Sequence, residues 1–181
     1  AWGRDKWKGH RAFALGGKVK NTGLSELGRA TTMRNTVYDI GGGLQGDRSC
    51  KAVQTGGPSG GCVPESLLDL PVDYEQLTEA GSMMGSGGMI VMDEDSCMVD
   101  VAKYFLHFLM EESCGKCVPC REGVARMHEI LERMTLGEGR EGDIDLLEEM
   151  STSVIDGSLC ALGGSAPNPV LSTLRYFRDE Y

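Results

Sequence analysis

The sequence contains no apolar run long enough to cross a membrane and no secretory leader. A spanning helix needs about twenty predominantly apolar residues, and no window of the 181 residues approaches that length. The N-terminal stretch from Ala1 to Lys6 lacks the apolar core of a signal peptide. An initiator methionine is also absent, so we expect a fragment or a processed product. Because neither a membrane span nor a leader is found, we expect a cytoplasmic location.

Aromatic residues are scarce, at 6% of the chain, although hydrophobic residues of all kinds reach 40%. That total is ordinary for a soluble globular protein. The core must therefore consist mainly of Leu, Ile, Val and the ten Met, whose flexible side chains fill irregular gaps. The length suits one domain of ordinary size or two small ones.

Positive charge is scarce in the second half of the chain. Residues 1–92 carry ten Lys or Arg and nine Asp or Glu, whereas residues 93–181 carry eight and eighteen. An acidic protein repels phosphate backbones, so a nucleic-acid partner is disfavoured. The change in composition predicts two segments of different character.

The pattern of residues 10–93 predicts a small α+β domain, and residues 1–9 are interpreted as a linker. Alternating or short apolar runs indicate strands, and capping residues before apolar positions indicate helices. The expected elements are a strand, turn and strand within 11–20, a helix over 33–40 capped by Thr31 or Thr32, a strand at 51–55, a short helix after Asp73 and a strand at 88–92.

Residues 94–181 change to helical periodicity, and four apolar stripes predict a four-helix bundle. Asp143 is expected to cap the third helix, and Asn168 with Pro169 to open the fourth. The stripes, in chain order, are Val101, Phe105, Phe108 and Leu109; Val124, Met127, Leu131 and Met134; Ile144, Leu147, Val154 and Ile155; Leu171, Leu174 and Phe177.

Three of the seven cysteines form a C-x2-C-x2-C run between the first and second predicted helices. Cys114, Cys117 and Cys120 are spaced so that each thiolate can meet a different iron of a 4Fe-4S cluster. The fourth iron needs a remote ligand, because the sequence contains only one such triplet.

Cys160 is the best candidate for that fourth ligand. It lies between the third and fourth predicted helices, and in an antiparallel bundle this connection is at the same end as the triplet. Lys116 and Arg121 flank the triplet, and we expect them to offset the negative charge of a cluster. Pro119 suits the opening of the following helix.

Zinc is the alternative metal for this triplet. A structural zinc site usually draws on two separate C-x2-4-C pairs or on Cys and His together, so zinc is the weaker alternative. Cys50, Cys62 and Cys97 lack metal-ligand spacing and are expected to be free thiols. His107 and His128 show no paired ligand nearby in the sequence.

Two glycine-rich stretches, 56–61 and 85–88, were considered as phosphate cradles. Neither contains G-x-G-x-x-G or a Walker A pattern, and neither precedes a long helix. We therefore interpret both as tight turns of the α+β domain.

Several motifs together resemble one known family. The run Glu112–Gly123, with the sequence ESCGKCVPCREG, is similar to the cluster motif of the flavin-bearing, NADH-oxidising subunit of respiratory complex I. The same subunit type occurs in soluble NAD(P)-linked hydrogenases, including electron-bifurcating ones, and in some formate dehydrogenases. Further similar stretches are Gly56–Pro64, Ala80–Gly88, Met89–Asp95 and Ala166–Arg178.

This resemblance implies a domain organisation and a set of cofactors. Residues 10–93 would form a soluble-ligand-binding β-grasp domain, and residues 94–181 the helical 4Fe-4S domain. The four cysteines Cys114, Cys117, Cys120 and Cys160 would be the cluster ligands. FMN and NAD(P)H would bind in an upstream domain of the parent subunit, which this chain lacks.

The function implied is electron transfer from the flavin, through the cluster, to other iron–sulfur subunits of a complex I-like or hydrogenase-like assembly. The chain alone would not be catalytic. The stretch Pro167–Val170 is closer to the hydrogenase branch, whereas Cys160–Gly163 is closer to complex I. The alternative function is a ligand- or partner-binding module with a structural metal.

Overall fold

The computed structural model describes residues 3–4, 7–28 and 31–181, and it divides into two compact units. The first, here called the sheet unit, contains the residues up to Gly57 together with Cys62–Ser96. The second, called the helical unit, contains Pro58–Gly61 and Cys97–Tyr181. Among the described residues, no helix is long and apolar enough to cross a membrane.

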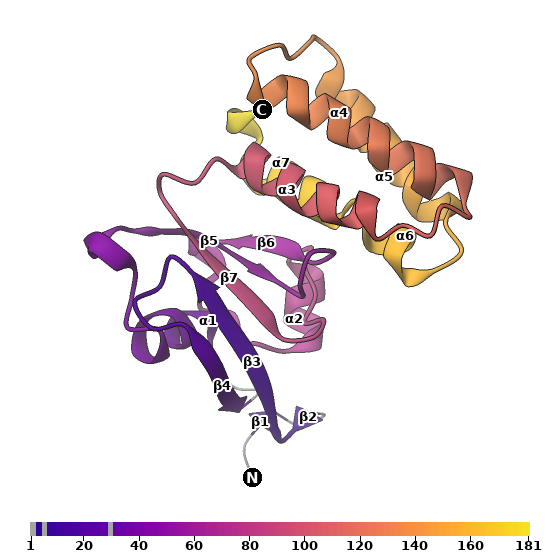
Figure 1. Ribbon diagram of the computed structural model, residues 1–181. Coiled ribbons are helices and arrows are strands. Elements are labelled where there is room, and N and C mark those ends of the chain that lie inside the picture. The colour runs from indigo at the N-terminus through magenta and orange to yellow at the C-terminus, as the bar shows by residue number, and fades with distance from the viewer. Residues whose placement is uncertain (1–2, 5–6, 29–30) are drawn as a thin grey trace. The chain divides into compact units, whose positions relative to one another are not determined.

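The sheet unit is built on a mixed five-stranded sheet (Figure 1). The strand order is β4-β3-β7-β5-β6, with β3 and β7 parallel at the centre and antiparallel pairs on either side, β3 with β4 and β5 with β7. This order is that of a β-grasp fold and agrees with the α+β class expected from the sequence. The strands are β3 (His10–Gly17), β4 (Gly23–Gly28), β5 (Cys50–Thr55), β6 (Gly61–Pro64) and β7 (Gly88–Asp93).

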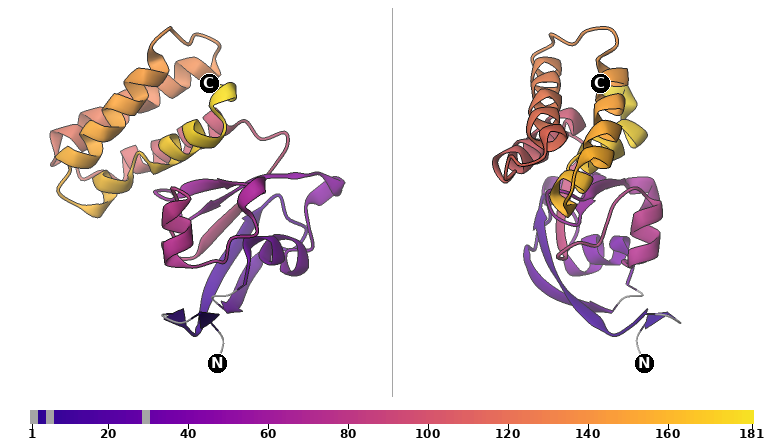
Figure 2. Two further views of the ribbon diagram at one scale, coloured as in Figure 1. Left: turned by 180° about the vertical axis from the view of Figure 1, so that it is seen from behind. Right: turned by 90° about the vertical axis from the view of Figure 1, so that its right-hand side faces the viewer.

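Short helices pack on one side of this sheet (Figure 2). The side chain of Thr32 accepts a hydrogen bond from the Asn35 N–H, and that of Asp73 accepts one from the Gln76 N–H, as N-cap residues do. Both helices contribute to a core shared with the strands. The helical segments are α1 (Met33–Asn35), which continues into the π-helical turn η1 (Thr36–Ile40), η2 (Gln45–Asp47), η3 (Glu65–Leu67) and α2 (Tyr74–Glu79).

Three details of the sheet unit differ from the sequence-based expectation. Residues 11–20 do not form a hairpin, because β3 continues unbroken to Gly17 and pairs with β4. The strands β4 and β6 were not predicted. Within residues 1–9, interpreted as a linker, β1 (Gly3–Arg4) and β2 (Trp7–Lys8) form an antiparallel pair.

The two glycine-rich stretches pack against each other as turns. Gly56 and Gly85 both have positive φ, and a Cβ on Gly85 would collide with the backbone of Gly56. The Gly56 N–H donates to the Gly88 carbonyl oxygen at 3.2 Å. The glycines are therefore needed for close backbone approach, which confirms their interpretation as turns.

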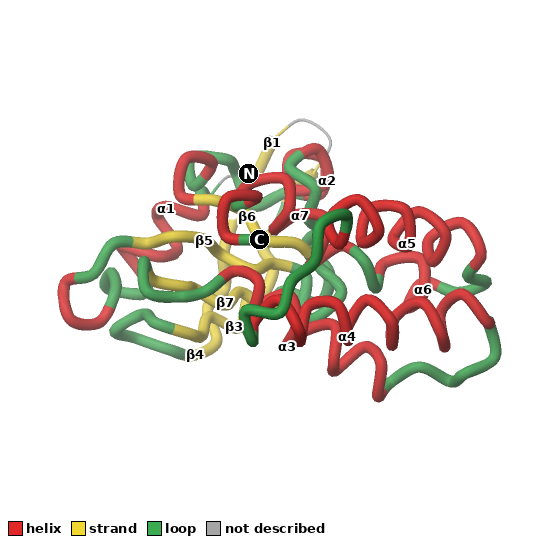
Figure 3. The backbone as a smooth tube through the Cα atoms, turned by 90° about the horizontal axis from the view of Figure 1, so that it is seen from above, coloured by secondary structure: helices red, strands yellow, loops and turns green. Residues whose placement is uncertain are grey.

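The helical unit contains four longer α-helices, the short α-helix α6, the π-helical turn η4 and the 3-10 turn η5 (Figure 3). Helices α3 and α4 lie side by side and bury a common apolar core with α5 and α7. The carboxylate of Glu180 accepts a hydrogen bond from the Met98 N–H at the start of α3. The segments are α3 (Met98–Glu111), η4 (Pro119–Gly123), α4 (Val124–Thr135), α5 (Asp143–Gly157), α6 (Ala161–Ser165), α7 (Asn168–Tyr176) and η5 (Arg178–Glu180).

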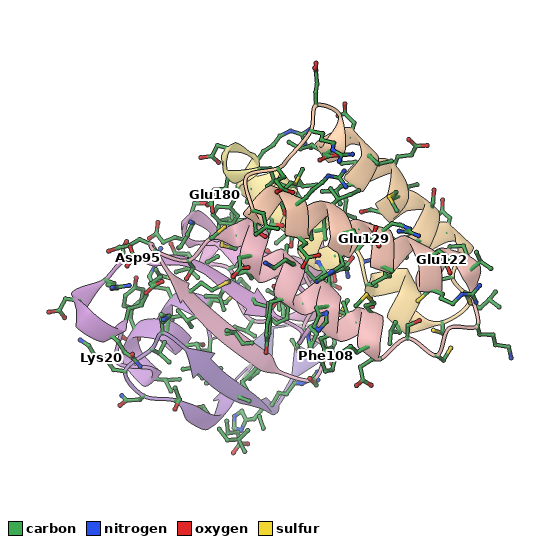
Figure 4. The ribbon with its side chains drawn as sticks, turned by 45° about the horizontal axis from the view of Figure 1, so that its top comes forward. Lys20, Asp95, Phe108, Glu122, Glu129 and Glu180 are labelled. Atoms are coloured by element: carbon green, nitrogen blue, oxygen red, sulfur yellow. The ribbon has the colours of Figure 1, made fainter. Side chains whose placement is uncertain are left out.

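The buried stripe of α3 is rotated from the predicted one. Phe105 and Leu109 are buried as expected, but Val101 is only half-buried and Phe108 is 44% exposed (Figure 4). The helix instead buries Ala102 and Leu106, which were not assigned to the stripe.

The capping predictions for the last two long helices were wrong. Asn168 is the first residue of α7, and its side-chain amide donates to the Ser59 carbonyl oxygen at 3.0 Å instead of capping. Asp143 is the first residue of α5, after Gly142 in the left-handed conformation. Its carboxylate accepts hydrogen bonds from Arg133 Nε and from the Arg140 N–H, both at 2.9 Å.

The Arg133–Asp143 ion pair should make the stability of the helical unit depend on pH. Its hydrogen bonds, chiefly from Arg133, lower the pKa of the Asp143 carboxyl. A lowered pKa contributes stability that is complete above the unfolded-state value of about 3.9 and is lost as pH falls through the folded-state value. We therefore expect Asp143→Asn to lower the urea unfolding midpoint of the helices at pH 7, and to differ less from wild type below about pH 4.

Asp145→Asn is the matched control for this experiment. Asp145 lies in the same first turn of α5, but its side chain is 86% exposed and 4.0 Å from Arg178. Exposed ion pairs contribute little to stability, so the urea unfolding midpoint of Asp145→Asn should stay near that of wild type. Equal losses in the two variants at pH 7 would show that the helix dipole, not the ion pair, is responsible.

Candidate metal centre

Four cysteines line one cavity in the helical unit. Cys114 and Cys117 approach it from the connection between α3 and η4, and Cys120 approaches it from η4 itself. Cys160 approaches it from the connection between α5 and α6. The cavity has a volume of about 90 Å³, which on this measure is several times the roughly 10–15 Å³ that one water molecule requires. Its other lining residues are Glu112, Ser113, Ser158 and Leu162.

The triplet follows the end of α3 in a tight turn. Gly115 has a φ of +72°, which favours glycine at this position. Cys120 is buried within η4, Cys117 is half-buried and Cys114 is exposed. The Arg121 N–H donates to the Cys117 carbonyl oxygen at 2.9 Å and so joins the loop to the following helical turn.

Cys160 is brought to the triplet by close packing of α5 against η4. A Cβ on Gly157 would lie 2.6 Å from Pro119 Cγ, and a Cβ on Gly123 would collide with Val154. The absence of side chains at these two glycines lets the end of α5 approach the turn that carries Cys120. Helix α6 consequently lies at the same end of the bundle as the α3–η4 connection (Figure 1), as the bundle topology predicted.

Helix α6 itself was not predicted, because residues 157–164 were interpreted as a loop. Its Gly163 is buried against two residues that line the cavity: a Cβ there would lie 2.5 Å from Ser158 Cβ and 3.3 Å from Cys120 Cβ. The neighbouring Gly164 has nothing within 4 Å of its Cβ position. Two adjacent glycines therefore occupy opposite environments.

This contrast predicts opposite effects of alanine at the two positions. Gly163→Ala should overpack the site, destabilise the helical unit by about 1–3 kcal/mol and weaken retention of a cluster. Gly164→Ala, the matched control, should be neutral or stabilise by up to about 1 kcal/mol, because glycine is a poor helix former. Urea unfolding and the iron content after gel filtration would measure both effects, and equal results at the two positions would contradict this packing.

The donor set fits a 4Fe-4S cluster. Four thiols around one cavity supply the four cysteine ligands that such a cluster takes. Among the described residues, no three His, Cys, Asp or Glu side chains converge as ligands of a single metal ion would. Four thiols that line one cavity without forming a site for a single ion suit a group with several metal atoms better than one ion.

The charged residues expected to offset a cluster lie beside the cavity and do not line it. Lys116 and Arg121 are both exposed. Arg121 donates to the Gly115 carbonyl oxygen, and its Nε is 3.2 Å from a carboxylate oxygen of Glu122, which lies at the same end of the unit (Figure 4). Glu122 partly neutralises the charge of Arg121. That Lys116 and Arg121 offset the negative charge of a cluster stays a prediction.

The remaining cysteines lie elsewhere. Cys50 and Cys62 are buried in the sheet unit, and Cys97 is exposed at the start of α3. Burial raises the pKa of the Cys50 thiol to about 11, so this thiol stays protonated at neutral pH. None of these three described cysteines forms a disulfide.

The structure also brings together two histidines that the sequence left unpaired. The rings of His107 on α3 and His128 on α4 lie with centroids 5.1 Å apart, and His107 Nε2 is 3.6 Å from a carboxylate oxygen of Glu111. Burial lowers the pKa of His128, and the neighbouring His107 lowers it further. The approach of the two rings could not be predicted, since residues on adjacent helices have no fixed spacing in the sequence. Among the described residues, neither histidine belongs to a group of ligands that could hold a metal ion.

Comparison with known proteins places this site in a family. Residues 100–181 match the family described as the NADH-ubiquinone oxidoreductase-F iron-sulfur binding region. An NADP-reducing hydrogenase subunit of Solidesulfovibrio fructosivorans is 52% identical over 174 residues, which cover 96% of this chain and 36% of that protein. An NADH-quinone oxidoreductase subunit of Rhizobium meliloti is 39% identical over 179 residues, covering 99% of this chain and 42% of the relative.

A solved structure shows the same fold. An NAD+-reducing nickel–iron hydrogenase in the H2-reduced state superposes with a TM-score of 0.86 at 28% identity, over 99% of this chain and 30% of that one. This chain thus spans about two fifths or less of the length of these three relatives. These findings confirm the resemblance drawn from the motifs, and the family match implies an iron–sulfur cluster in the helical unit.

Proposed function

We propose, from the premise that this chain belongs to the NADH-ubiquinone oxidoreductase-F iron–sulfur family, that it relays single electrons through a 4Fe-4S cluster held by Cys114, Cys117, Cys120 and Cys160. The observation that carries this proposal is the convergence of these four thiols on one cavity, three from the α3–η4 connection and η4 itself and one from the connection between α5 and α6. Such a cluster, when bound, supplies one-electron redox chemistry.

The chain's own residues would set the environment of that chemistry. Cys120, at 6% exposure, would provide a ligand on the protein side, while Cys114 and Cys160 would provide ligands near the surface. This asymmetry leaves one side of the site close to solvent. A partner's redox group approaching that side would be the natural electron acceptor or donor.

We further propose that FMN and NAD(P)H bind in other parts of a longer parent protein, and that electrons pass on to iron–sulfur partner subunits. The relatives' names support this, since they are subunits of an NADH-quinone oxidoreductase and of an NADP-reducing hydrogenase. Identity is 52% to the hydrogenase protein and 39% to the quinone oxidoreductase protein, and this difference favours a hydrogenase-type assembly. Seven cysteines without a disulfide fit a cytoplasmic location.

A reductive titration tests the relay role directly. The chain, loaded with iron and sulfide under anaerobic conditions, should take up about one electron from dithionite and return it to a one-electron acceptor such as ferricyanide. NADH should leave it oxidised, since the proposed flavin site lies elsewhere. A metal-loaded chain that takes up no electron would contradict the relay and favour a binding module with a structural metal. Flavin-dependent NADH oxidation by the chain would contradict the placement of the flavin site.

A further inference from the structure

One hydroxyl group lies beside the most buried cysteine of the metal centre. Ser113, directly before the triplet, has its Oγ 3.3 Å from Cys120 Sγ. Both residues line the cavity. Because Cys120 is 6% exposed, water competes little for its sulfur, and a hydrogen bond in such surroundings has a larger electrostatic effect than one at the surface.

The surroundings of Ser113 fix the direction of this hydrogen bond. The Gly115 N–H donates to Ser113 Oγ at 3.3 Å, so the hydroxyl oxygen serves as an acceptor there. Its own proton remains available for a second partner. A cysteine bound to iron is a thiolate with no proton to give. Ser113 is therefore the donor and the Cys120 sulfur the acceptor.

The second serine of the cavity provides a contrast. Ser158 also lines the site, but its hydroxyl donates to the Val154 carbonyl oxygen at 2.6 Å. Val154 lies in α5, and Ser158 is the residue directly after that helix. A serine hydroxyl has one proton, so Ser158 cannot donate to a sulfur in this arrangement. The two serines are thus matched in location and differ in where their protons point.

We infer that Ser113 is a positioning residue that raises the reduction potential of the cluster by donating a hydrogen bond to the Cys120 thiolate. This rests on the proposed function, since it requires the cluster. Reduction adds a negative charge that spreads onto the thiolate sulfurs, so a hydrogen bond to sulfur stabilises the reduced state more than the oxidised state. The same turn that presents Cys114 thereby also sets the potential.

Redox titration of the cluster-loaded chain, followed by electron paramagnetic resonance, measures this effect. Ser113→Ala should shift the equilibrium toward the oxidised state by about threefold to tenfold, which is roughly 30–60 mV at about 59 mV per tenfold change for one electron. Ser158→Ala should leave the potential near wild type.

A threonine and valine pair at position 113 separates the hydroxyl from packing. The two side chains have nearly the same shape, and only threonine carries a hydroxyl. Ser113→Thr should keep a reduction potential near that of wild type, whereas the potential of Ser113→Val should be lowered by about as much as that of Ser113→Ala.

Equal potentials in wild type, Ser113→Ala and Ser113→Val would overturn the inference while leaving the cluster assignment intact. Failure of the Ala and Val variants to hold any cluster, with Thr competent, would also overturn it, because the hydroxyl's role would then be assembly rather than tuning. Failure of the wild-type chain to take up a cluster would overturn the proposed function itself, and this inference with it.

Discussion

Replacing Cys160 with alanine should leave the chain with at best a damaged three-iron species. Cys114, Cys117 and Cys120 would hold three irons, and Cys160, which reaches the same cavity from the connection between α5 and α6, would hold the fourth. Without that thiolate the fourth iron lacks a protein ligand. Iron and sulfide analysis, with electron paramagnetic resonance of the oxidised sample, would detect the loss.

Cys97→Ala is the matched control, because Cys97 is an exposed cysteine of the same unit and lies outside the cavity. It should retain about four irons and the wild-type signal. If Cys160→Ala also kept an intact four-iron signal, another residue would have to complete the site, and the ligand assignment would be wrong.

Binding of the cluster should protect the helical unit strongly against amide hydrogen exchange. The ligands link the α3–η4 connection to the start of α6, so a cluster bound only by the folded state adds its binding free energy to folding. We expect exchange of core amides in α4 and α5 to slow by at least about tenfold, equivalent to about 1.4 kcal/mol, on loading the chain.

The sheet unit serves as the internal reference in the same experiment. Its core draws on its own strands and short helices and contains none of the four candidate ligands. Amide hydrogen exchange in the sheet unit should be the same with and without the cluster. Equal protection of residues 97–181 with and without the cluster would show that helix packing alone holds the site in shape.

The sequence predicted much of this arrangement because the signals were local. The strand at 51–55 and the helix after Asp73 follow from short apolar patterns and a capping residue, and both are present as β5 and α2. The meeting of the four cysteines could be predicted because bundle topology places their two connections at one end.

Other features depended on contacts between distant residues and could not be predicted. Asp143 follows the pattern of a capping residue, but Arg133 on the neighbouring helix engages its carboxylate. Helix α6 is too short to show a period. Position 163 must be glycine because Ser158 and Cys120 lie too close for a side chain there. The hydrogen bond between Ser113 and Cys120 depends on the conformation of a turn, which the spacing of the cysteines in the sequence does not reveal.

The cluster itself is the claim on which the rest depends, and low-temperature electron paramagnetic resonance of the reduced, iron-loaded wild-type chain tests it most directly. Together with metal and sulfide analysis, the account predicts a brown protein with about four irons and four sulfides per chain and the spin-½ signal of a reduced 4Fe-4S cluster. A colourless protein that carries a single zinc ion and gives no signal would contradict it.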